Sequence, residues 1–277
     1  MVYNYFRAIK RKLFNNGVFW SGDYKQWDEA QKKCSGYSEE LILEKVKAAA
    51  LAVKRGEASY ERDSVLFYKP QIAEQLVSSL LNIAGENNGH LNILDFGGSL
   101  GSLYYQNREA LASHCQFTWN IVEQAHYVRS GKQYFADAEL NFFDTIHECL
   151  SNGPLNVVLA ACVLQYIKDP YYWMEQFMNT GAKYIILDRM GFIESTDDVL
   201  TIQKVPPTIY EGSYPCYFFN KQKVLSFLEK KGFILVTEWP DHITAAVKVN
   251  GKNCYWSTLV CKKNVLIDHP SEITIDA

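Results

Sequence analysis

The chain has 277 residues, of which 48% are hydrophobic and 21% are charged, and its formal net charge at pH 7 is −3. This length and composition are sufficient for one sizeable core with an additional segment. The slightly acidic balance argues against a nucleic acid partner, which usually requires a basic face. No apolar run reaches the roughly 18 residues that a membrane-spanning helix needs.

The seven cysteines are scattered along the chain, and no two of them stand in a CxxC spacing. This pattern predicts small buried hydrophobic residues in a reducing compartment and argues against a structural zinc site. The N-terminus also lacks the uninterrupted apolar stretch of a secretory signal. We therefore expect a cytoplasmic protein.

The first segment, residues 1–14, combines aromatic and aliphatic side chains at near-helical spacing with four basic residues. One interpretation is an arm that makes weak contact with an anionic membrane surface. The other, which we favour, is a helix that docks on the core, because one short segment buries little apolar area on a membrane. Residues 15–37 are rich in Gly, Asn and aromatic residues, which predicts irregular structure.

Two helices are expected next. Ser38 can cap the first helix and Gly56 can end it, while the second begins near Pro70 and ends before Gly85. Together with the preceding segments they predict an N-terminal helical cap over residues 1–90.

From residue 91 to residue 277, short β-rich runs alternate with helical stretches. This alternation predicts an α/β fold, a Rossmann-like core with a seven-stranded, mostly parallel sheet and helices on both faces. No helical stretch separates the last two runs, which predicts an antiparallel hairpin at the end of the sheet. The seven runs are LNILDF, FTWNIVE, LNFFDTI, LNVVLAACVL, KYIILDR, FILVTEWP and NCYWSTLVCKK.

The first of these strands leads into the most informative stretch, LNILDFGGSLGS. Asp95 stands at the carboxyl end of the strand, where doubly wound sheets bind their ligands. Gly97, Gly98 and Gly101 follow, and a backbone without Cβ atoms can approach a ligand closely. Glu123 ends the next strand, where a carboxylate can accept both hydroxyls of a ribose. These residues predict a cofactor that contains a nucleoside.

Two classes of cofactor compete for this turn. A dinucleotide site has the spacing GxGxxG, whereas the glycines here are spaced GGxxG and follow Asp95 directly. A carboxylate at that position would repel a pyrophosphate, but it suits a positively charged amino acid end such as that of S-adenosylmethionine. No GK[ST] follows, which excludes a P-loop.

The stretch ILDFGGSLGS resembles motif I of class I S-adenosylmethionine-dependent methyltransferases, and VVLAACVLQYIKDP resembles their fourth-strand motif. Further stretches resemble one bacterial methyltransferase family that is associated with surface polysaccharide gene clusters: GVFWSGDYKQWDEA, ERDSVLF and QKVPPTIYEGSYPCYFF. The resemblance covers nearly the whole chain. It implies methyl transfer from S-adenosylmethionine to a small molecule or a glycan precursor.

By position, the resemblance assigns the cofactor site to residues at the ends of the first four core strands. Of these, Asp95 would border the amino acid end, Glu123 would take the ribose hydroxyls and Asp144 would approach the adenine. Ser99 departs from the family pattern, because a second motif glycine usually stands there. The assigned residues are Asp95, Gly97, Gly98, Ser99, Gly101, Glu123, Gln124, Asp144, Thr145, Ile146, Ala161, Leu164, Gln165 and Tyr166.

Three residues beyond the strand ends are candidates for catalysis. Asp188 either binds the acceptor or acts as a base, or it forms an ion pair with Arg189 that holds the following loop. His242 is a candidate base, although a lone histidine in a late loop is more often a packing or surface residue. Tyr214 lies in the stretch 203–219, whose prolines predict a rigid loop over the active edge of the sheet.

Two further groups are singled out as polar candidates. Tyr210 lies in the same predicted loop as Tyr214. Glu61, Arg62 and Asp63 are consecutive charged residues, which form either an ion network or part of the entrance to the site.

The sequence thus predicts metal-independent methyl transfer, with O-methylation favoured over N-methylation. Two alternatives stay open: an NAD(P)-dependent oxidoreductase, and a non-catalytic Rossmann-like binding protein.

Overall fold

The structure is a computed structural model that describes residues 18–35, 39–206, 212–241 and 247–264. Its main sheet has the strand order β11-β13-β8-β7-β4-β5-β6, and the short strand β12 pairs with β13 outside this path. The pairs between β6, β5, β4, β7 and β8 are parallel, whereas β13 runs antiparallel to both of its long neighbours. The strands are β4 (His90–Phe96), β5 (Gln116–Val122), β6 (Leu140–Phe143), β7 (Val157–Ala161), β8 (Tyr184–Ile193), β11 (Phe233–Pro240), β12 (Val247–Val249) and β13 (Lys252–Lys263).

The central strands are apolar throughout because both of their faces are covered. In β7, Val157 and Leu159 contribute to one hydrophobic core, and Val158 and Ala160 contribute to the other. This period-two alternation between two cores explains why the sequence of such a strand shows no polar face.

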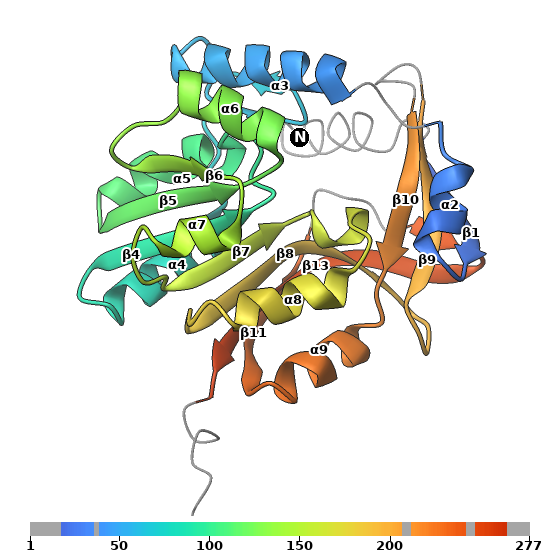
Figure 1. Cartoon of the computed structure of the whole chain (residues 1–277). Helices are drawn as coiled ribbons and strands as arrows, with labels where there is room; N and C mark the ends of the chain where they lie inside the picture. The colour runs from blue at the N-terminus through green and yellow to red at the C-terminus, as the bar shows by residue number, and fades with distance from the viewer. Residues whose placement is uncertain (1–17, 36–38, 207–211, 242–246, 265–277) are drawn as a thin grey trace, which may run out of the picture.

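Helices cover the two faces of the sheet in separate groups (Figure 1). One core packs α3 (Glu39–Lys54), α4 (Glu74–Gly85), α5 (Ser102–Ala112) and α6 (Ala125–Tyr134) against the sheet. The other core packs α7 (Ile146–Leu150), α8 (Pro170–Met178) and α9 (Lys221–Glu229) against the opposite face. This is the three-layer Rossmann-like architecture predicted from the sequence, with β12 as one strand more than the seven expected. The predicted antiparallel end of the sheet is confirmed by the pairing of β11 with β13.

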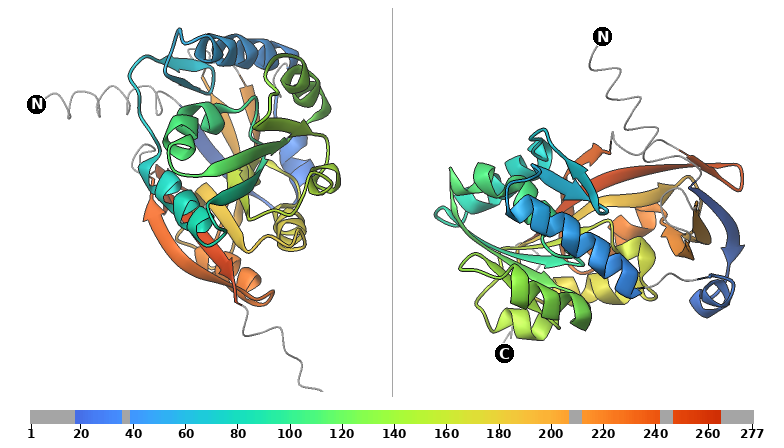
Figure 2. Two further views of the ribbon diagram at one scale, coloured as in Figure 1. Left: turned by 90° about the vertical axis from the view of Figure 1, so that its left-hand side faces the viewer. Right: turned by 90° about the horizontal axis from the view of Figure 1, so that it is seen from above.

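A second, three-stranded antiparallel sheet stands beside the main sheet, and we call it the arm. It consists of β1 (Phe19–Tyr24), β9 (Val199–Val205) and β10 (Gly212–Phe218), with α2 (Trp27–Lys32) packed on it. Figure 2 shows, from above, α3 across the middle of the molecule and the arm at its side. Three aromatic rings join the arm to β13, with centroids 5.5–5.7 Å apart: Trp20, Phe218 and Trp256.

The arm corrects two sequence predictions. Residues 15–37 were expected to be irregular, but their described part contains β1 and α2. The stretch 203–219 was expected to be a rigid loop, but β9 ends and β10 runs within it. Pro215 does not prevent this strand, because β10 is an edge of the arm and an edge position tolerates a missing N–H.

Between α3 and α4 the chain forms a small hairpin of β2 (Tyr60–Arg62) and β3 (Val65–Phe67), in the segment that separates the two predicted helices. The following helix begins at Glu74 rather than near Pro70. The side chain of Asn107 on α5 explains the delay, because its Oδ1 accepts the backbone N–H of Ala73 at 2.9 Å and anchors the chain before the helix starts.

Across the described ranges, no helix is both long enough and apolar enough to cross a lipid bilayer.

Gly131 on α6 offers a test of how tightly one helix packs on the sheet. A Cβ added there would overlap the ring of Phe142 on β6, whereas a Cβ at Gly85 on α4 would meet nothing within 4 Å. We expect Gly131→Ala to lower the free energy of unfolding by about 1–3 kcal/mol through overpacking. Gly85→Ala should leave it unchanged or raise it by up to about 1 kcal/mol. Chemical denaturation measures both, and equal effects would contradict this packing.

Candidate cofactor and acceptor site

Asp95 is the buried centre of the candidate site, with 0% of its surface exposed. The indole Nε1 of Trp119 on β5 donates a hydrogen bond to its Oδ2 at 2.9 Å. Its Oδ1 is also buried and has no hydrogen-bond partner in the part of the chain that the structure describes. A buried acceptor in this state favours a donor from a ligand, and a cationic donor most of all.

The turn that follows Asp95 requires its glycines, because side chains would not fit there. Gly97 and Gly101 have φ angles of +73° and +96°, which glycine adopts without strain. A Cβ at Gly97 would overlap Val163, and a Cβ at Gly98 would overlap the carboxylate of Asp95. The predicted turn therefore exists as a cradle of backbone next to Asp95.

Ser99 occupies the turn in the left-handed region, with φ +56°. Few residues other than glycine adopt this conformation. Its backbone N–H is one of the groups that lower the pKa of Glu123, so the turn lies near the end of β5. Ser99 thus departs from the family pattern in residue type, but its backbone has a conformation that a glycine would adopt.

Glu123 follows the last residue of β5, and the backbone N–H of Gln124 donates to its Oε2 at 2.6 Å. Burial raises the pKa of Glu123, and the two backbone N–H groups of Gln124 and Ser99 lower it. Its own N–H donates to Phe143 O at 3.2 Å, so β5 and β6 end side by side. The structure therefore brings the ends of β4, β5 and β6 to one edge of the sheet.

The start of α7 contains the residues that the resemblance assigns to the adenine. Thr145 caps this helix, and its Oγ1 accepts the N–H of Glu148 at 3.1 Å. The cap leaves Asp144 exposed at the end of β6, and Ile146 half-buried behind it.

Electrostatic surroundings shift the pKa of Asp95 to about 7. Burial is the largest cause of the increase, and the negative charges of Glu123 and Asp188 add to it. The hydrogen bond from Trp119 and the positive charge of Arg189 act in the opposite direction. A ligand cation next to Asp95 would lower this pKa and stabilise the carboxylate.

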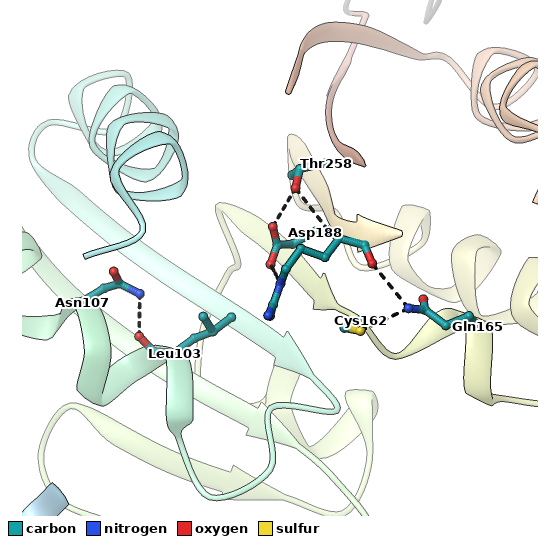
Figure 3. A network of polar contacts seen from close by, with 7 residues as sticks. Leu103, Asn107, Cys162, Gln165, Asp188 and Thr258 are labelled. Carbon is teal, nitrogen blue, oxygen red and sulfur yellow. Dashed lines mark hydrogen bonds and ion pairs between the residues drawn. The ribbon is translucent and has the colours of Figure 1, made fainter. Parts of the chain in front are cut away.

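The predicted fourth-strand residues form a tight turn after Ala161. The backbone N–H of Cys162 donates to Asp188 O at 2.8 Å, which ties β7 to β8. The side chain of Gln165 donates to Cys162 Sγ at 3.1 Å and to Arg189 O at 3.4 Å (Figure 3). Gln165 is thus occupied with holding the backbone around the predicted site.

The side chain of Asp188 takes part in a network of polar contacts that includes the ion pair with Arg189. Its Oδ2 accepts from Arg189 Nε at 2.8 Å, and its Oδ1 accepts from Thr258 Oγ1 at 2.7 Å (Figure 3). The residue is 7% exposed, and both of its oxygens are engaged. These contacts orient the side chain of Arg189, a role that does not require Asp188 to contact a substrate.

A second network joins the arm to the short 3₁₀ helix η1 (Leu164–Tyr166). The hydroxyl of Tyr166 and the indole N–H of Trp20 both donate to Gln203 Oε1, at 3.0 and 2.9 Å. Gln203 Nε2 donates to the hydroxyl of Tyr214 at 2.9 Å, and the rings of Tyr166 and Tyr214 meet edge to face. The structure therefore brings two predicted candidates together and adds Gln203 and Trp20.

Sequence reasoning missed Gln203 and Trp20 because their contacts join segments that are 183 residues apart. Their only signal is that both lie in stretches that resemble the family, and the resemblance gave neither residue a role. His242 and Tyr210 lie outside the described residues. The same is true of the N-terminal segment 1–14, for which membrane contact was one interpretation.

Glu61, Arg62 and Asp63 do not pair with one another as a simple ion network. The carboxylate of Glu61 accepts hydrogen bonds from Ser102 Oγ, at the first residue of α5, and from Ser64 N. The hairpin β2–β3 therefore lies next to the helix that follows the glycine turn.

Comparisons with family models and with curated proteins gave no match. Among solved structures, the N-terminal domain of EvdMO1 with bound SAH is similar, at 14% identity over 83% of this chain and 98% of that chain, with a TM-score of 0.46. An S-adenosylmethionine-dependent methyltransferase from Clostridium acetobutylicum is 12% identical over 79% and 98%, with a TM-score of 0.45. Magnesium protoporphyrin IX methyltransferase from Synechocystis PCC 6803 is 14% identical over 82% and 100%, also with a TM-score of 0.45.

The raised pKa of Asp95 predicts how the binding of a cationic ligand depends on pH. With a pKa of about 7, Asp95 is mostly protonated at pH 6 and mostly ionised above pH 8. We expect S-adenosylhomocysteine, which carries an α-ammonium group, to bind about tenfold more weakly at pH 6 than at the plateau above pH 8. Isothermal titration calorimetry measures this, and Asp95→Asn should remove the dependence. A pH-independent affinity of the unsubstituted protein would contradict the assignment.

The left-handed conformation of Ser99 predicts a gain in stability on replacement by glycine. Ser99→Gly should raise the free energy of unfolding by up to about 1 kcal/mol, because glycine adopts this φ without strain. Ser113 provides the control, since it ends α5 with φ −69°. Ser113→Gly should lower the free energy of unfolding through backbone entropy. A loss of stability in both variants on chemical denaturation would show that Ser99 is unstrained.

Proposed function

We propose that the protein is an enzyme that transfers a methyl group from S-adenosylmethionine to a small-molecule acceptor. The observation that carries the proposal is the unpartnered, buried Oδ1 of Asp95 beside a backbone cradle in which a Cβ would collide. A dinucleotide would place a pyrophosphate against this carboxylate, whereas S-adenosylmethionine places an ammonium group there.

The residues of this chain fit the cofactor part by part. Asp95 would accept from the ammonium group, and Glu123 would accept from the ribose hydroxyls at the end of β5. Gln124 and Asp144 would flank the adenine, and the turn from Ala161 to Tyr166 would lie under the methionine part. When bound, the cofactor supplies an electrophilic sulfonium methyl group.

For the acceptor we propose O-methylation of a small molecule, with a glycan precursor as the favoured class on the basis of the family resemblance. The network of Tyr166, Gln203 and Tyr214 supports a hydroxyl acceptor. The single proton of the Tyr166 hydroxyl is donated to Gln203, so the lone pairs of that oxygen can accept from an acceptor hydroxyl. Burial raises the pKa of Tyr166 well above its ordinary value, so the residue stays neutral and orients the acceptor rather than removing its proton.

Most of the rate enhancement would then come from orientation and exclusion of water, since methyl transfer needs an in-line approach of acceptor oxygen and methyl group. The arm would form one wall of the acceptor site. Tyr214 lies on the arm, and its ring contacts that of Tyr166, which follows the fourth-strand motif. This contact would link the acceptor wall to the cofactor side of the sheet.

Binding of S-adenosylhomocysteine to isosteric variants tests the cofactor assignment. Asp95→Asn and Glu123→Gln keep the shape of the side chains but remove the charge that binds the ammonium group or the ribose hydroxyls. We expect each to lower the affinity about tenfold or more in calorimetry, the size of one charge-assisted hydrogen bond. Glu44→Gln on the exposed surface of α3 is the matched control and should leave the affinity unchanged.

The same protein should be stabilised against heat by S-adenosylhomocysteine and not by NAD or NADP. Stabilisation by a dinucleotide alone would establish the oxidoreductase alternative instead. An unchanged affinity in both the Asp95 and the Glu123 variants would contradict the proposed site.

A further inference from the structure

Arg62 is a charged side chain near the site that has no ion-pair partner in the part of the chain that the structure describes. Arg62 stands at the end of β2 and is half-buried, and its guanidinium group makes no hydrogen bond or ion pair with any residue that the structure describes. A guanidinium group that leaves water normally acquires an acceptor, because an unpaired buried charge is costly. Arg62 therefore differs from Arg189, whose Nε is bound to Asp188.

The hairpin that contains Arg62 is tied to the helix that follows the glycine turn. Ser102 Oγ donates to Glu61, and this contact ties β2 to the first residue of α5. Arg62 pairs with Val65 across a two-residue turn, in which Asp63 and Ser64 both have positive φ angles. A turn of this kind reverses the chain sharply, so Arg62 has a defined position beside the amino end of α5.

The charges that face Arg62 come from several elements. Burial lowers the pKa of its guanidinium, and the positive charge of Arg189 on β8 lowers it further. Tyr60, Asp63 and Asp241 act in the opposite direction, without an ion pair to Arg62 among the described residues. Two guanidinium groups that repel each other in a partly buried space are stabilised by an anion that binds near both.

We propose that Arg62, with Arg189 close to it, receives one carboxylate or phosphate group of a ligand bound beside the glycine turn. This inference rests on the proposed function, because it concerns the ligand that is proposed to bind beside the glycine turn. Two sources can supply the anion: the methionine carboxylate of the cofactor, or an acidic group on the acceptor. The first is favoured, because Asp95 and Arg62 then provide opposite charges for the ammonium and carboxylate groups of one amino acid.

Two ligands that differ in the amino acid part distinguish the two possible sources of the anion. S-adenosylhomocysteine carries the carboxylate, and 5′-methylthioadenosine lacks it. We expect Arg62→Gln to weaken S-adenosylhomocysteine binding about 10- to 100-fold in calorimetry, the range for a charge-assisted pair, and to leave methylthioadenosine binding unchanged. Arg55→Gln, which removes an exposed arginine of a surface ion pair, is the matched control and should change neither.

The acceptor as source predicts a different pattern. Arg62→Gln would then bind S-adenosylhomocysteine as the unsubstituted protein does, but inorganic phosphate would no longer raise the melting temperature of the S-adenosylhomocysteine complex. Unchanged behaviour toward both S-adenosylhomocysteine and phosphate would overturn the proposal. If the unsubstituted protein binds neither nucleoside, the proposed function fails, and the phosphate response alone decides whether Arg62 binds an anion.

The melting temperature of the ligand-free protein distinguishes a purely structural role of Arg62 from a role in ligand binding. If Arg62 serves a ligand, its replacement by Gln removes an uncompensated charge, and the melting temperature without ligand should stay equal or increase. A lower melting temperature together with parallel losses for both nucleosides would overturn the proposal. Arg62→Lys should restore part of the S-adenosylhomocysteine affinity, because it keeps the charge but loses the planar fork.

Discussion

The candidate site depends on a carboxylate that the fold removes from water. Asp95 ends a central strand whose two faces are both covered, so solvent cannot satisfy it, and the indole of Trp119 satisfies only one of its oxygens. A carboxyl group in this position is either protonated or paired with a cation. The glycine turn follows this carboxylate directly, and the backbone of Ser99 in that turn lowers the pKa of Glu123.

The proposed acceptor side is built in another way. Gln203 connects Trp20, Tyr166 and Tyr214, three residues from β1, η1 and β10 that are brought together only when the arm folds against β13. The aromatic contacts with Trp256 fix the arm to the main sheet. The proposed cofactor side therefore comes from strand ends of one sheet, whereas the proposed acceptor side requires two sheets to meet.

Most of the core could be predicted from the sequence because its parallel strands are short apolar runs that alternate with helical stretches. The largest differences from the predictions fall in the arm. Pro215 made a strand improbable by local rules, yet an edge strand tolerates it, and β1 pairs with residues about 180 positions later, which no local pattern reveals. The same holds for the candidate site. Asp95 and Glu123 could be predicted because they stand at strand ends, whereas Gln203 could not.

The sequence by itself determined the alternating core, the glycine turn, and the acids that end the first strands, because parallel strands bring their carboxyl ends to one edge whatever surrounds them. Only the tertiary structure decided what each acid does. Asp188 has both oxygens engaged, whereas Asp95 keeps one oxygen without a partner. It also decided that Arg62 lacks an ion-pair partner among the described residues. The reason is that partners of a buried charge come from elements distant in the chain, and only packing brings them within reach.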